Sequence, residues 1–135
     1  MYQTNNLSHA DAMRIIEAIR AELETTGRGA AVAVCDAHGE LLAFLRTDDC
    51  PFPSIHIAIN KAFTAARQRM ESRAVGDELR DGQHNMTNFG DLRYTGWGGG
   101  VPIRYAGAVI GAVGVSGLPE EEDMVLARMG AGLLE

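Results

Sequence analysis

The 135-residue sequence has little cysteine and no long hydrophobic run. It nowhere contains the roughly 18 consecutive apolar residues of a membrane-spanning helix, and its start, MYQTNNLSHADAM, lacks the basic and apolar segments of a signal peptide. Its two cysteines, Cys35 and Cys50, lie in an apolar run and in a proline-containing loop, without CxxC spacing. We therefore expect a cytoplasmic protein with no membrane partner and no structural disulfide.

Clustered positive charge and metal-binding motifs are also missing. The formal net charge is −6, and no stretch gathers Lys or Arg, which argues against a nucleic-acid partner. The histidines at positions 9, 38, 56 and 84 are scattered, so the sequence has neither an HExxH helix nor a zinc-ribbon spacing. We expect no intrinsic metal site.

The composition that remains is typical of a soluble globular protein, with 46% hydrophobic and 22% charged residues, and we assign residues 1–135 to a single domain. Ser8 and Asp11 form a capping-box-like start to an amphipathic helix that ends at Gly27. The runs AAVAVCD and ELLAFLR are separated by AHG, which predicts a hairpin of two buried strands.

The second half contains further helices and a second hairpin. After DDCPFPS a second helix is expected, with Ser54 and Lys61 at one border of its apolar stripe. That stripe consists of Ile55, Ala58, Ile59, Ala62, Phe63, Ala66 and Met70. A short helix near residues 75–80 and a long loop follow. The runs VPIRY and AVIGAVGVSG predict a second hairpin, and Pro119 opens a last helix with an acidic first turn.

Because hairpins rather than crossovers connect the strands, the predicted fold class is α+β: a layered domain with a mainly antiparallel sheet and flanking helices, in the order α-β-β-α(-α)-β-β-α. Within it, the stretch TGWGGGVPI is no standard phosphate-binding loop, since a proline and a strand follow its glycines. Two interpretations remain: a tight bend, or a ligand wall of exposed backbone.

Several separated stretches resemble the GlcG/HbpS-like family, the haem-degrading domain also found at the C-terminus of PduO-type adenosyltransferases. They are LSHADAMRIIEAI, AVAVCDAHGELLAFLRTDD, SIHIAINKAFTAA, GGVPIRYAGAVIGAVGVSG and PEEEDMVLARMG, and they span almost the whole chain. The resemblance implies a profilin-like or roadblock-like fold and assembly into a higher homo-oligomer. At the positions of the family's pattern it places Arg46, Lys61, the segment Gly99 to Pro102, and Asp123.

The resemblance also implies a small-molecule ligand, and its first candidate is haem or a related tetrapyrrole. An imidazole ligand to haem iron would come from His9, His56 or His84, with Cys50 or Met86 as weaker candidates. The residues expected to bind a ligand are Arg46, Lys61, Trp97, Gly99, Gly100 and Pro102.

An alternative is a lyase that releases ammonia from a hydroxylaminobenzoate-type aromatic acid. Arg46 and Lys61 would bind the carboxylate, and the proposed catalytic residues are His56, Lys61, Glu121 and Asp123. Apolar walls would come from Phe89, Tyr94 and Trp97. In purely structural roles, Arg46 would instead pair with Asp123, and Lys61 would be solvated.

A third hypothesis is a non-catalytic assembly protein. Gly111 and Gly114 would then permit close contact between subunits.

Overall fold

The computed structural model describes residues 1–134. Its elements follow the order predicted from the sequence, with two additional short 3-10 helices. They are α1 (His9–Thr26), β1 (Ala31–Asp36), β2 (Leu41–Arg46), α2 (Ser54–Gln68), α3 (Ser72–Arg80), η1 (Met86–Phe89), β3 (Gly100–Tyr105), β4 (Ala108–Ser116), α4 (Glu120–Ala131) and η2 (Gly132–Leu134). Among these described residues, no helix has the length and apolar content needed to span a membrane.

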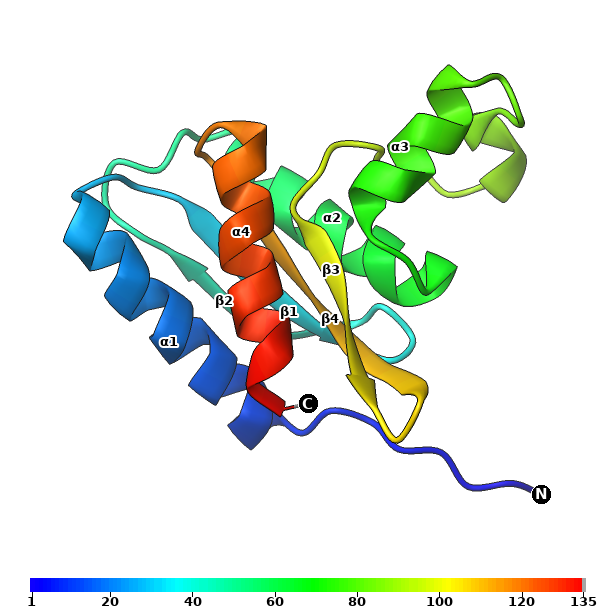
Figure 1. The fold of residues 1–135 in the computed structure, drawn as a ribbon, viewed down its shortest axis with the longest axis horizontal. Helices are drawn as coiled ribbons and strands as arrows, with labels where there is room; N and C mark the ends of the chain where they lie inside the picture. The colour runs from blue at the N-terminus through cyan, green and yellow to red at the C-terminus, as the bar shows by residue number, and fades with distance from the viewer. Residues whose placement is uncertain (135) are drawn as a thin grey trace.

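The four strands form one antiparallel sheet in the order β2-β1-β4-β3. Each hairpin supplies one central and one edge strand, and the pairing of β1 with β4 joins the two hairpins. Helices α1 and α4 cover one face of the sheet, while α2 lies on the opposite face (Figure 1). This arrangement confirms the predicted α+β fold class.

Local signals position the first helix as expected. The Ser8 hydroxyl accepts a hydrogen bond from the Asp11 backbone N–H at 3.1 Å, and Gly27 ends the helix in a left-handed conformation with φ +67°. The five apolar residues predicted to face the core are all buried: Ala12, Ile15, Ile16, Ile19 and Leu23. Sequence periodicity therefore sufficed to orient α1.

The expectation of two buried strands in the first hairpin is wrong for β2. Strand β1 is almost entirely buried, whereas β2 is an edge strand with only Ala43 fully buried and with Leu41 exposed. Helix α2 also ends before Met70, which is only half-buried. An apolar run does not distinguish an edge strand from a central one, because both carry hydrophobic residues on the face that packs on a helix.

Helix α2 packs closely on the sheet. The strand residues beneath it are small, and Gly114 pairs with Gly100 across β4 and β3. A Cβ atom added at Gly114 would lie 2.1 Å from the Ala58 carbonyl oxygen, and one at Gly100 would lie 2.2 Å from the Lys61 carbonyl oxygen. These two glycines therefore allow the backbone of α2 to contact the strands directly.

The suggestion that Gly111 and Gly114 serve subunit contact is wrong, because both glycines face other parts of the same chain. A Cβ atom at Gly111 would lie 2.5 Å from the Cys35 carbonyl oxygen and 3.2 Å from Leu7. Their lack of a side chain is explained by packing within the fold.

Candidate functional site

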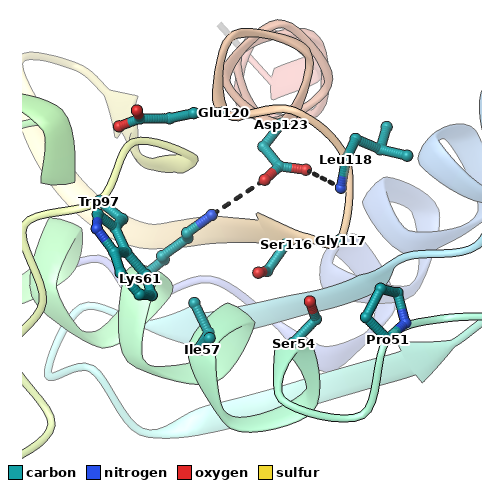
Figure 2. A pocket seen from close by; sticks show the side chains of 10 residues that line it. All are labelled: Pro51, Ser54, Ile57, Lys61, Trp97, Ser116, Gly117, Leu118, Glu120 and Asp123. Carbon is teal, nitrogen blue, oxygen red and sulfur yellow. Dashed lines mark hydrogen bonds and ion pairs between the residues drawn. The ribbon is translucent and has the colours of Figure 1, made fainter.

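The candidate site is built around Lys61, a buried lysine on the sheet-facing side of α2. Its side chain is only 3% exposed. The Nζ atom donates a hydrogen bond to the Val115 carbonyl oxygen at 2.9 Å. It donates a second to Asp123 Oδ2 at 3.2 Å (Figure 2). The sequence-based alternative in which Lys61 is solvated is therefore wrong. The buried face of α2 includes Lys61 as well as the apolar residues from which that face was predicted.

Asp123 lies in the first turn of α4 and is equally buried. Its second oxygen, Oδ1, accepts a hydrogen bond from the Leu118 backbone N–H at 3.0 Å. The carboxylate thus closes the turn that leads into α4 and at the same time holds the lysine. It does not pair with Arg46, so the structural ion pair considered from the sequence is replaced by Lys61–Asp123.

Burial shifts the protonation equilibria of this pair in opposite directions. Loss of water lowers the pKa of the Lys61 amine and raises the pKa of the Asp123 carboxyl, and their mutual attraction partly opposes both shifts. The two pKa values therefore move toward each other, and the energy needed to pass a proton from Lys61 to Asp123 is smaller than in water.

The pair borders a cavity of about 300 Å³. The lining residues, drawn in Figure 2, are Pro51, Ser54, Ile57, Lys61, Trp97, Ser116, Gly117, Leu118, Glu120 and Asp123. Ser54, Ile57 and Lys61 share one face of α2 because they are spaced three and four residues apart. Trp97 is 59% exposed and forms an outer wall, whereas Ser54 and Ser116 are buried hydroxyl groups.

Glu120 adds a second carboxylate to the cavity. Its Oε1 accepts a hydrogen bond from the Gly98 backbone N–H at 2.6 Å and lies 3.4 Å from the Arg73 guanidinium. The carboxylate therefore ties the glycine-rich segment to the start of α4. Glu121, proposed as a catalytic residue, is exposed, contacts Arg73 at 3.3 Å and does not line the cavity.

The glycines of TGWGGGVPI mostly serve close packing. Gly96 lies against Gly76 of α3, and Gly100 lies against the backbone of α2. Gly99 has φ +123°, and a Cβ there would lie 2.5 Å from the Val115 carbonyl oxygen and 2.9 Å from Lys61 Nζ. Neither Gly99, Gly100 nor the buried Pro102 lines the cavity, so a role in ligand binding would be exerted through Lys61.

Arg46 is separated from the other predicted ligand-binding residues. It lies at the exposed end of β2, with its guanidinium 5.9 Å from the centre of the Phe52 ring, and borders other surface hollows. Phe89 and Tyr94 stack at 4.4 Å and join Phe63 in an aromatic cluster. Of the three aromatic walls expected from the sequence, the cavity contains Trp97 alone.

The three candidate haem ligands lie outside the cavity. His9 is exposed in the first turn of α1, and His56 is exposed on α2. His84 is half-buried beside the Phe89 ring, and its Nε2 atom lies 3.9 Å from Glu78 Oε2. Cys50 is buried, and Met86 is half-buried in η1.

Sequence reasoning missed a compositional signal at this site. Lys61 is the only lysine of the chain, which otherwise has eleven arginines and four histidines as its basic side chains. Ser54, Ser116 and Glu120 were not proposed either, because isolated serines and a glutamate in an acidic helical turn have no distinctive spacing. Only the meeting of α2, β4 and α4 gives them a common role.

The fold and site define an α+β protein with a lysine–aspartate pair buried between the sheet and two helices. Residues 7–132 match the family model described as haem degrading protein HbpS-like, and the chain belongs to this HbpS-like family. The resemblance stated from the sequence motifs is thus confirmed.

Relatives and solved structures agree with this assignment. Protein GlcG of Escherichia coli K12 is 37% identical over 110 residues, covering 82% of this chain and 81% of GlcG. A crystal structure of a variant of HbpS from Streptomyces reticuli has a TM-score of 0.89 at 29% identity, covering 100% of this chain and 91% of that one. The crystal structure of the PduOC:heme complex has a TM-score of 0.85 at 25% identity and covers 93% of each chain.

Proposed function

We propose that this protein binds haem or a related tetrapyrrole. The observation that carries the proposal is the similarity to the PduOC:heme complex, together with membership of a family described by haem degradation. Both relate to nearly the whole chain rather than to a local motif.

The residues present fit such a ligand at the surface rather than inside the cavity. About 300 Å³ is the lower end of the volumes of small-molecule pockets, so a tetrapyrrole macrocycle would not be enclosed there. His9 offers an accessible imidazole, which is a suitable ligand for haem iron. Met13, 53% exposed, follows one helical turn later and adds apolar surface beside it.

A surface site of this kind leaves one side of the macrocycle in water unless a second molecule covers it. Self-association into a homo-oligomer would cover that side. Haem binding and oligomerisation, both implied by the family resemblance, would then depend on the same surface. Haem bound in this way would stabilise the oligomer, because it would contact two subunits at once.

Titration of the purified protein with haem tests the proposal. We expect a saturable shift of the Soret band that is lost on replacing the iron ligand, with His9→Ala, His56→Ala and His84→Ala measured separately. His38→Ala, in the exposed turn between β1 and β2, is the matched control. An unshifted spectrum, or a full shift in all three variants, would contradict haem ligation by these residues.

A second candidate is lyase activity on a small aromatic acid, favoured by the size of the cavity and by its lysine–aspartate pair. Because Arg46 and His56 lie outside it, this candidate requires Lys61 to turn from Asp123 to the substrate carboxylate and Asp123 to transfer the proton, and it competes with any use of the cavity by an uncharged ligand. Ammonia release from a hydroxylaminobenzoate measures this activity. Turnover that survives both Lys61→Met and Asp123→Asn would exclude it.

A further inference from the structure

We propose that Lys61 is a carbonyl-reactive amine, and that its cavity admits a small uncharged aldehyde or ketone that forms an imine with Nζ. The site is separate from the surface proposed for haem. The site uses Lys61, whose primary amine can form an imine, which the guanidinium of an arginine does not do.

The basic residues of the chain point to a need for a primary amine. Apart from the four histidines, every other basic residue is an arginine, and none of the arginines is buried within residues 1–134. A buried partner for Asp123 that served structure alone is a role for which arginine is well suited. Lysine differs in that its neutral amine is a nucleophile toward carbonyl compounds.

The hydrogen bonds of Lys61 leave a nucleophilic position open toward the cavity. Nζ donates two bonds, to Val115 and Asp123, and has no further partner among residues 1–134. Transfer of the proton to Asp123 leaves the lone pair of Nζ facing that carboxyl group. Rotation about the Cε–Nζ bond then turns the lone pair toward the cavity, while the two remaining N–H groups are directed at Val115 and Asp123. Since Lys61 lines the cavity, a molecule placed there can approach Nζ.

The charges and walls of the cavity favour an uncharged compound. Two carboxylates line it, and each already has a cation beside it: Lys61 lies 3.2 Å from Asp123, and Arg73 lies 3.4 Å from Glu120. The lining residues therefore hold no unpaired cation for an added carboxylate. The hydroxyls of Ser54 and Ser116 can donate to a carbonyl oxygen. Ile57, Trp97 and Leu118 supply apolar contacts, and about 300 Å³ admits a small organic molecule.

The reaction needs no reagent beyond the carbonyl compound. Lys61 first passes its ammonium proton to Asp123, 3.2 Å away. The amine lone pair then forms the C–N bond, and the carbonyl π electrons move to oxygen. The two remaining N–H protons leave with that oxygen as water while the C=N bond forms, and the proton taken by Asp123 stays on the carboxyl group. Neither oxidation nor reduction occurs.

Reductive trapping tests the proposal on the intact protein. The folded protein is incubated with propionaldehyde and sodium cyanoborohydride near pH 7, and mass spectrometry measures propylation of Lys61 and of the Met1 amino group. We expect a Lys61-to-Met1 labelling ratio above one in the folded protein. In urea the ratio should fall at least tenfold, because an unperturbed lysine, with a pKa of about 10.4, is far more protonated than an α-amine with a pKa of about 8.

Two comparisons sharpen the result. Lys61→Arg should lose the internal label and keep the Met1 label. The haem titration of the unaltered protein tests the haem proposal separately, because that proposal places haem at the surface beside His9. Pyruvate should label Lys61 more slowly than propionaldehyde, relative to Met1. An unlabelled Lys61 in the folded protein, or a ratio equal to that in urea, would overturn the proposal. Equal labelling by pyruvate would overturn the choice of an uncharged ligand.

Discussion

Removing one partner of the Lys61–Asp123 pair should destabilise the protein in a manner that depends on pH. In Lys61→Met, Asp123 loses the charge 3.2 Å away and keeps the hydrogen bond from Leu118. Breaking a buried ion pair in this way costs about 3–5 kcal/mol, which is a large part of a total stability of about 5–15 kcal/mol.

Protonation of Asp123 limits this cost at low pH. Burial already raises the pKa of its carboxyl, and loss of the ammonium raises the pKa further. Between the unfolded pKa of about 3.9 and that higher folded value, the folded state holds one more proton, so the stability of the variant falls as pH rises, by up to about 1.4 kcal/mol per pH unit. The loss in free energy of unfolding caused by Lys61→Met is therefore smallest at acidic pH.

Asp123→Asn should show the opposite trend. Its amide oxygen can still accept the Leu118 N–H, while Lys61 keeps a buried charge without a carboxylate. The pKa of Lys61, already lowered by burial, falls further, so the unfolded state binds more protons up to about pH 10.4 and stability rises with pH. The double variant Lys61→Met with Asp123→Asn should lose both trends.

Urea denaturation followed by circular dichroism, at several pH values and one protein concentration, measures all four proteins. A deficit in Lys61→Met that is below about 1 kcal/mol, or that does not change with pH, would refute the description of this pair as a buried ion pair.

Two further predictions concern packing and thiol reactivity. Gly100→Ala should destabilise the protein by about 1–3 kcal/mol or more, since its Cβ would lie 2.2 Å from the Lys61 carbonyl oxygen. Gly132→Ala, whose added Cβ would meet no heavy atom within 4 Å beyond its own stretch of chain, is the control. Equal melting temperatures for the two variants would contradict the close approach of α2. Burial raises the pKa of the Cys35 thiol to about 12, so a thiol reagent at about pH 8 should modify it only after denaturation. Rapid modification of Cys35 in the folded protein would disprove its enclosure, and Cys50, whose pKa is also raised by burial, gives an internal comparison.

Features of the fold that depend on interactions between neighbouring residues could be predicted from the sequence. The capping of α1 by Ser8, the turn at Ala106 and Gly107, and the acidic start of α4 all follow from interactions within a few residues. The position of β2 at a sheet edge was not predictable in the same way. It depends on which strand pairs with β4, a long-range contact that the apolar content of ELLAFLR does not reveal.

The same distinction applies to the site. Lys61 and Asp123 were named from the family pattern, but their mutual contact joins residues 62 positions apart and was instead assigned to Arg46 and Asp123. Helical periodicity placed Lys61 at the border of the apolar stripe. Lys61 is buried because the glycines beneath α2 let the helix pack closely on the sheet. This effect depends on strand pairing and cannot be seen in the helix sequence alone.

The close contact between α2 and the sheet also determines where ligand preference can be altered. The floor of the site is backbone packed on backbone at Gly100 and Gly114, so substitutions there change the position of the helix and with it the reactive amine. Trp97, in contrast, is largely exposed and lies in a connecting segment. A library intended to accept a bulkier compound should vary Trp97 and keep both glycines constant, because the aperture can be widened there without displacing Lys61.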